Sequence, residues 1–151
     1  MSRIAQFAAY ADAFEKAFVS DDWSPIEPFF TEDAVYDAML PPPLGGRFEG
    51  RDAILAYFKY VLDHFDRRFE SREIALLEGP TEDGDSVWLR GSATYRAAGV
   101  PEFVLELEET VTFEGDRIRR LEDRYEPATT QHIRAYLKEH GRELGMPPLD
   151  D

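Results

Sequence analysis

Residues 103–126 read FVLELEETVTFEGDRIRRLEDRYE, and the alternation of apolar and polar side chains in this stretch decides the fold. Successive side chains of a β-strand point to opposite faces of the sheet, so residues of one parity share a face. The odd positions carry the apolar side chains, namely Phe103, Leu105, Leu107, Val111, Phe113, Leu121 and Tyr125. The stretch therefore predicts two antiparallel strands, 103–114 and 117–126, each with one buried face.

Two acidic residues, Glu109 and Asp123, interrupt this apolar face. Matching the two buried faces requires paired positions whose numbers sum to an even number, which predicts a three-residue loop over 115–117. The same register predicts three facing pairs: Val111 with Leu121, Leu107 with Tyr125, and Glu109 with Asp123. The sequence thus places two carboxylic acids opposite each other on the inner face of a hairpin.

Facing side chains on neighbouring strands have Cβ atoms roughly 5 Å apart, so two ionised carboxylates there repel strongly. A shared proton relieves the repulsion and leaves an acid beside a base near neutral pH, which is the arrangement of a general acid–base site. Two alternatives remain open. Arg47, Arg51 or Arg119 reaches the pair and forms a structural ion-pair network, or the register differs from the predicted one and one of the acids is solvated.

The remaining elements follow from hydrophobic spacing on either side of this hairpin. Apolar residues recur every three or four positions in three helical segments, and Ser24 can cap a further short helix with Pro25 at its first position. Apolar and polar residues alternate in two further strands, and 34–39 resembles a short third one. We predict helices at 4–19, 25–30, 52–68 and about 130–144, strands at 34–39, 70–78 and 86–97, and an irregular Pro/Gly loop at 41–50. This order predicts one α+β domain over residues 1–151, with its core at about 4–127 and a curved antiparallel or mixed sheet covered by helices.

Composition excludes several classes of function. Lys and Arg total 17 against 31 Asp and Glu, a net charge of −14 that disfavours binding to nucleic acids and membrane surfaces. The chain has no cysteine, and His64, His132 and His140 lack metal-ligand spacing, so we predict neither a disulfide nor a metal site. The N-terminal residues do not resemble a signal peptide, and we expect a cytoplasmic protein.

Apolar residues at outward positions indicate a contact surface. Trp88, Val104 and Ile118 fall on the outward parity of their strands among polar neighbours. Such a patch favours a homodimer formed through the outer face of the sheet.

Four local motifs resemble those of the nuclear-transport-factor-like superfamily, and particularly its SnoaL-like and ketosteroid-isomerase-like members. They are Asp22-Trp23 after the first helix, FTEDAVY at 30–36, FEGRDAI at 48–54 and DRIRRLEDRY at 116–125. The resemblance covers most of the chain from about 10 to 127. It implies a cone in which a bent sheet and helices enclose a deep pocket. The pocket residues expected here are Phe14, Trp23, Tyr36, Tyr57, Tyr95, Leu107 and Tyr125.

The resemblance also implies roles for the two acids. Asp123 matches the last-strand acid that serves as general base in SnoaL-like polyketide cyclases, and Glu109 matches the protonated acid of the ketosteroid-isomerase oxyanion hole. The isomerases' base and first-helix tyrosine instead fall on Ala38 and Phe14. The third-strand Arg and Asp of limonene-epoxide-hydrolase-like enzymes fall on Gly91 and Ala93 of this chain.

We therefore expect a cofactor-independent isomerase, cyclase or hydrolase that moves a proton on a small apolar cyclic or polyketide-like molecule. Asp123 would be the base, and Glu109 would donate to a developing enolate or hydroxyl. The alternative is a non-catalytic ligand-binding or dimerisation module of the same fold.

Overall fold

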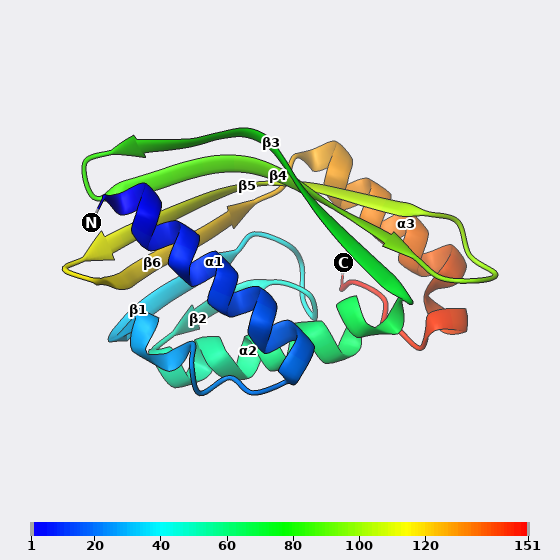
Figure 1. Cartoon of the computed structure of the whole chain (residues 1–151). Helices are drawn as coiled ribbons and strands as arrows, with labels where there is room; N and C mark the ends of the chain where they lie inside the picture. The colour runs from blue at the N-terminus through cyan, green and yellow to red at the C-terminus, as the bar shows by residue number, and fades with distance from the viewer. Residues whose placement is uncertain (1, 151) are drawn as a thin grey trace.

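The computed structural model describes residues 2–150, in which a curved sheet carries α1 and α2 on one side (Figure 1). The chain runs α1 (Arg3–Ser20), η1 (Glu27–Phe29), β1 (Phe30–Ala38), β2 (Gly46–Glu49), α2 (Arg51–His64), η2 (Asp66–Arg68), β3 (Ser71–Asp83), β4 (Ser86–Arg96), β5 (Phe103–Glu114), β6 (Arg117–Arg124) and α3 (Pro127–Leu144). The strand order is β2-β1-β6-β5-β4-β3. Because β1 and β6 are parallel and the other neighbours antiparallel, the sheet is mixed and the predicted α+β class is confirmed.

The boundaries of several segments differ from the prediction. Strand β1 begins at Phe30 rather than 34, the expected 25–30 helix is only the 3-10 turn η1, and α2 ends at His64 with the separate turn η2 after it.

A short strand, β2, occupies 46–49 within the expected 41–50 loop, because its backbone pairs with β1. Helix α3 begins at Pro127 rather than near 130, since a proline suits the first turn of a helix. Strand β3 continues past Pro80 to Asp83, which its position at the edge of the sheet permits.

The hairpin of β5 and β6 has the predicted register along most of its length but a different turn. Glu114 pairs with Arg117, so the turn has two residues and not the predicted three. The pairing shifts between Thr112, which faces Arg120, and Phe113, which faces Ile118. Arg119 is therefore the extra residue of a β-bulge, and the bulge restores the even sum that matched inner faces require.

Because of the bulge, the predicted outer apolar patch of Trp88, Val104 and Ile118 is wrong. Ile118 is fully buried, because the extra residue at Arg119 turns it from the outward to the inward face. Val104 remains exposed on the outer face and Trp88 is half-buried. The three residues thus do not form one apolar surface.

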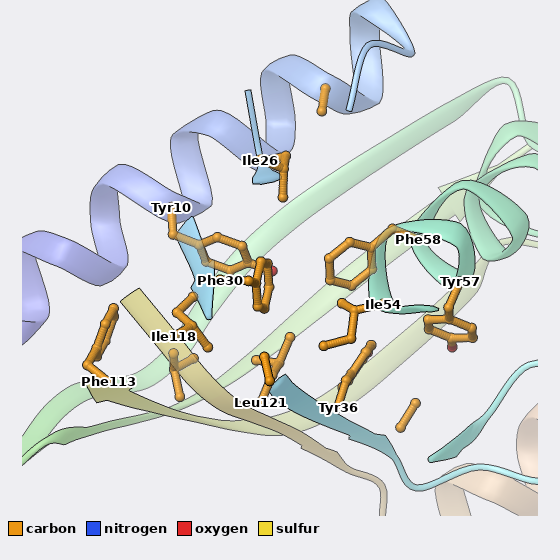
Figure 2. Close-up of a cluster of buried hydrophobic side chains, with 14 of the residues drawn as sticks. Tyr10, Ile26, Phe30, Tyr36, Ile54, Tyr57, Phe58, Phe113, Ile118 and Leu121 are labelled. Carbon is orange, nitrogen blue, oxygen red and sulfur yellow. The ribbon is translucent and has the colours of Figure 1, made fainter. Parts of the chain in front are cut away.

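Helices α1 and α2 bury aromatic side chains against the concave face of the sheet (Figure 2). On α1, the hydroxyl of Ser2 accepts a hydrogen bond from the Ala5 amide and starts the helix, and Tyr10 lies within 5.6 Å of Phe30, centroid to centroid. On α2, Phe58 packs edge-on against Phe14. A second apolar cluster joins α3 to the other end of the sheet through Ile133, Tyr136, Leu137, Phe65, Tyr95 and Phe103.

Candidate active site

Glu109 of β5 and Asp123 of β6 face each other on the concave side of the sheet, in the predicted register. Glu109 lies between Asp123 and Leu89 of β4, so the pair occupies the centre of the sheet. Asp123 is buried, with 6% of its surface exposed. Glu109 is half-buried and borders a cavity. The strands alone therefore bring two carboxyl groups together inside an apolar shell.

Hydrogen bonds define how Asp123 is held. The hydroxyl of Tyr36, on the neighbouring strand β1, donates to Oδ2 of Asp123 over 2.5 Å. The other oxygen, Oδ1, is buried and accepts nothing from the N–H and hydroxyl groups of residues 2–150. A protonated Glu109 carries an O–H donor that suits this acceptor, and a hydrogen bond between the two acids is one cause of the raised pKa of Glu109.

The three arginines considered as partners of the pair are engaged elsewhere. Arg47 pairs with Asp37 and Glu49, and Arg51 pairs with Glu27 and Glu32. Arg119 is exposed at the bulge. The repulsion between Glu109 and Asp123 is thus not relieved by any of these cations.

The surroundings act differently on the pKa values of the two acids. Burial, then the charge of Asp123, then the hydrogen bond between them raise the pKa of Glu109 well above its ordinary value. Burial also raises the pKa of Asp123, but the hydrogen bonds from Glu109 and Tyr36 oppose that rise because they stabilise the carboxylate. These directions favour the proton of the pair on Glu109 and the ionised form on Asp123.

A cavity of about 680 Å³ opens in front of the pair. Its size is that of a site for a small organic molecule, and most of its lining is apolar and aromatic. Both acids line it, as do six of the seven predicted pocket residues, which are Phe14, Tyr36, Tyr57, Tyr95, Leu107 and Tyr125. Gly91 and Ala93 lie on the same wall and leave room there because they are small.

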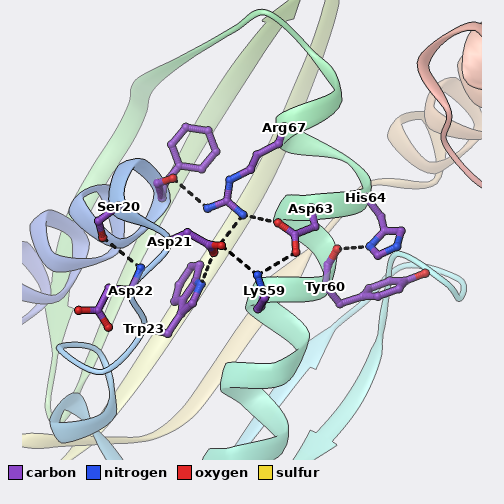
Figure 3. A network of polar contacts seen from close by, with 10 residues as sticks. Ser20, Asp21, Asp22, Trp23, Lys59, Tyr60, Asp63, His64 and Arg67 are labelled. Atoms are coloured by element: carbon purple, nitrogen blue, oxygen red, sulfur yellow. Dashed lines mark hydrogen bonds and ion pairs between the residues drawn. The ribbon is translucent and has the colours of Figure 1, made fainter.

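Trp23, the seventh predicted pocket residue, lies outside the lining. Its ring packs against Phe14 and Phe58, and its indole N–H donates to Asp21 at the end of α1 (Figure 3). Asp21 also pairs with Lys59 of α2. Trp23 therefore belongs to the contacts that fix α1 against α2.

Two predicted pocket tyrosines have hydroxyls already committed to the protein. Tyr57 donates to the carbonyl of Leu44 and so anchors the loop before β2. Tyr95 donates to Oδ2 of Asp66 over 2.9 Å. Tyr36, by contrast, donates its hydroxyl hydrogen bond to a member of the acid pair, Asp123.

Sequence reasoning missed several polar residues of the cavity, among them Tyr10, Asp66 and Arg72. Tyr10 is buried one helical turn before Phe14, and the charges of Glu109 and Asp123 add to burial in raising its pKa. Its place on the inward face of α1 is visible in the helical spacing. Arg72 has the parity of the apolar residues of β3, which was a usable signal, whereas no pattern indicated Asp66.

The mouth of the cavity lies between α1 and the edge strand β3. Ile74 and Leu76 face inward by register, opposite Ala93 and Gly91, yet are 52% and 57% exposed. Ile4 of α1 also lines the cavity and is partly exposed. An apolar rim therefore surrounds the entrance.

Residues 2–150 lack two features that would define other classes of site. No group of three or more His, Asp or Glu side chains is arranged to hold a metal ion in that part of the chain. None of the helices it contains is long and apolar enough to cross a membrane.

Comparison with known proteins assigns the fold to a family. Residues 9–121 match the family described as SnoaL-like domain. An NTF2-like protein of unknown function from Burkholderia pseudomallei is 22% identical, with a TM-score of 0.65 over 90% of this chain and 98% of that one. A candidate isomerase from Bacillus subtilis is 16% identical, with a TM-score of 0.69 over 99% of this chain and 100% of that one.

A third solved structure is a candidate polyketide cyclase from Sinorhizobium meliloti. It is 24% identical, with a TM-score of 0.57 over 77% of this chain and 94% of that one. No curated protein sequence matches the chain. These similarities show the fold and leave the activity to be argued from the site.

Proposed function

The chain belongs to the SnoaL-like domain family, and from this premise we propose that it is a cofactor-independent acid–base enzyme acting on a small apolar cyclic or polyketide-like molecule. The observation that carries the proposal is that Glu109 and the buried Asp123 face each other at the wall of an aromatic cavity. The structural likeness to a candidate isomerase and a candidate polyketide cyclase supports it.

The reaction that suits this geometry is proton transfer next to a carbonyl group. Asp123 takes a proton from carbon, and Glu109 donates its proton to the oxygen on which negative charge develops. The hydroxyl of Tyr36 holds the carboxylate of Asp123 in place before the transfer. An apolar surrounding strengthens each of these interactions, because little water is present to screen them.

Proton transfer can be tested before the substrate is known. The protein is incubated in D₂O with a panel of cyclic ketones and aryl ketones, and deuterium uptake next to the carbonyl is measured by mass spectrometry. We expect uptake with wild type, a loss of about 10²-fold or more for Asp123→Asn, and a smaller loss for Glu109→Gln. Glu106→Gln, on the outer face of β5, is the matched control.

Equal exchange rates in wild type and Asp123→Asn refute the assignment of Asp123. Absence of exchange with every ketone that binds the cavity favours the alternative, a non-catalytic binding module. Binding is followed separately by NMR, so the two results are distinguishable.

A further inference from the structure

A second polar cluster lies in the same cavity, at the end away from the acid pair. It consists of Asp66 from η2, Arg72 from β3, Tyr95 from β4 and Glu15 from α1, all of which line the cavity. On β4, Tyr95 is six residues from Leu89, the neighbour of Glu109. At a rise of about 3.4 Å per residue, this is roughly 20 Å of strand.

The contacts of Arg72 with two carboxylates use only part of its guanidinium. Nε lies 3.0 Å from Oδ2 of Asp66, and Nη1 donates to both carboxylate oxygens of Glu15, over 2.8 and 3.0 Å. The planar group also lies over the ring of Phe18, 4.8 Å from its centroid. The contacts of Arg72 with these carboxylates run through Nε and Nη1, and Arg72 also hydrogen-bonds to the hydroxyl of Tyr95, which itself donates to Asp66. The side chain is thus fixed on two sides, while Nη2 carries two further N–H donors that neither ion pair uses.

The charges around Arg72 restrict what those donors accept. It is the one cationic side chain in the described lining of the cavity, and it faces the acids Asp66 and Glu15. Its positive charge is already balanced, so a ligand carboxylate or phosphate would meet surplus negative charge. A neutral acceptor oxygen, such as that of a carbonyl or a phenol, avoids this repulsion.

We propose that Arg72, held by Asp66 and Glu15, is a specificity-determining residue that binds a neutral carbonyl or phenol oxygen of the ligand, at the end of the cavity opposite Glu109 and Asp123. The proposal deepens the proposed function and uses the same cavity. It defines the substrate class as an elongated apolar ring system with an oxygen at each end. One oxygen meets the acid pair, and the other meets Arg72.

The test uses binding, which does not depend on turnover. The probes are two matched pairs of aryl alcohols: 4-phenylphenol with 4,4′-biphenol, and 4-hydroxystilbene with 4,4′-dihydroxystilbene. Dissociation constants are measured by titration calorimetry. For at least one pair, we expect wild type to bind the dihydroxy member about tenfold more tightly than the monohydroxy member.

The variants assign that preference to Arg72. Arg72→Met removes the donors and is expected to abolish the preference while the monohydroxy probe still binds. Arg72→Lys keeps a positive charge between Asp66 and Glu15 but lacks the planar guanidinium, so we expect it to reduce the preference. It also avoids the loss of stability that Arg72→Met risks by leaving the buried Asp66 without a cation. Arg96→Met, in exposed ion pairs with Glu73 and Glu102 outside the cavity, is the control.

The outcomes separate this proposal from the proposed function. A dihydroxy preference that persists in both folded Arg72 variants, or is absent from wild type for both pairs, overturns the role of Arg72 and leaves the acid pair untouched. Tighter binding of a matched carboxylate, 4′-hydroxybiphenyl-4-carboxylate, than of 4,4′-biphenol overturns the preference for a neutral oxygen. Failure of the proposed function appears instead as unchanged deuterium exchange in Asp123→Asn.

Discussion

The hydroxyl of Tyr36 donates to Oδ2 of Asp123 over 2.5 Å, although the two residues are 87 positions apart in sequence. The parallel pairing of β1 with β6 creates this contact, since it sets Tyr36 beside Leu121 and Ala38 beside Asp123. The hydrogen bond stabilises the ionised form of Asp123, and it is the direct link between the aromatic wall and the proposed base.

Replacing Tyr36 with phenylalanine tests this link. A hydrogen bond to a charged group contributes about 1.5–3 kcal/mol, and 1.36 kcal/mol corresponds to one pH unit. Loss of the donor raises the pKa of Asp123 further, so the acidic limb of the pH profile for deuterium exchange moves to higher pH by about one unit or more. Tyr60→Phe, whose ring stacks on His64, is the control. An unshifted limb contradicts the role of Asp123 as the base.

Glu109→Gln tests which acid holds the proton, because glutamine mimics the neutral carboxyl group. The pKa of Glu109 is raised from an ordinary 4.5, so the folded state binds more protons than the unfolded chain above that pH. The stability due to this group is therefore complete below about pH 4.5 and is lost as pH rises through the folded pKa.

The variant should accordingly match wild type in thermal stability near pH 4.5 and exceed it increasingly toward pH 9. Each 1 kcal/mol corresponds to about 2–4 °C in Tm for a chain of this size. Glu106→Gln, on the outer face, should show no such divergence. A Glu109→Gln curve that stays parallel to wild type across this range contradicts a protonated Glu109.

Ala93→Leu tests whether ligands occupy the described cavity. Ala93 lies inward between Ile74 and Leu105, where a larger side chain fills the space in front of the sheet. We expect binding of 4-phenylphenol to weaken at least tenfold while Tm does not fall, since each buried CH₂ contributes about 0.8 kcal/mol. Thr94→Leu, on the opposite face, is the control. Unchanged binding would place the ligand elsewhere.

The facing of Glu109 and Asp123 was predictable because strand parity is a local property. Apolar residues at odd positions of both strands fix which side chains share a face, and the numerical sum then fixes the pairing. The turn was not predictable by this argument. An even sum is met equally by a three-residue loop and by a two-residue turn with a bulge, and the burial of Ile118 depends on which occurs.

The second polar cluster shows the other limit of sequence reasoning. Parity places Arg72 inward with Ile74, but its partner Glu15 is 57 residues away on α1. Asp66 lies in the short helix η2 after α2, which is too short for hydrophobic spacing to show which way its side chains point. Such a site depends on how α1 and α2 pack on the sheet, which hydrophobic spacing does not specify.

Deletion of Arg119 tests the bulge and, through it, the register of the site. Without this residue, the pairs Thr112 with Arg120 and Phe113 with Ile118 become consecutive in a regular ladder. We expect the variant to fold, to lose less than about 3 kcal/mol of unfolding free energy, and to keep Asp123 opposite Glu109. Strand NOEs and denaturant unfolding measure these outcomes.

Deletion of Glu122 is the opposing control, because it shifts Asp123 by one position and so turns its side chain to the outer face. That variant should lose the bond to Tyr36 and the deuterium exchange attributed to Asp123. If deleting Arg119 also separates Asp123 from Glu109, the bulge itself sets the register. In that case the matching of the inner faces does not set the register, and the parity argument for the acid pair is wrong at its first step.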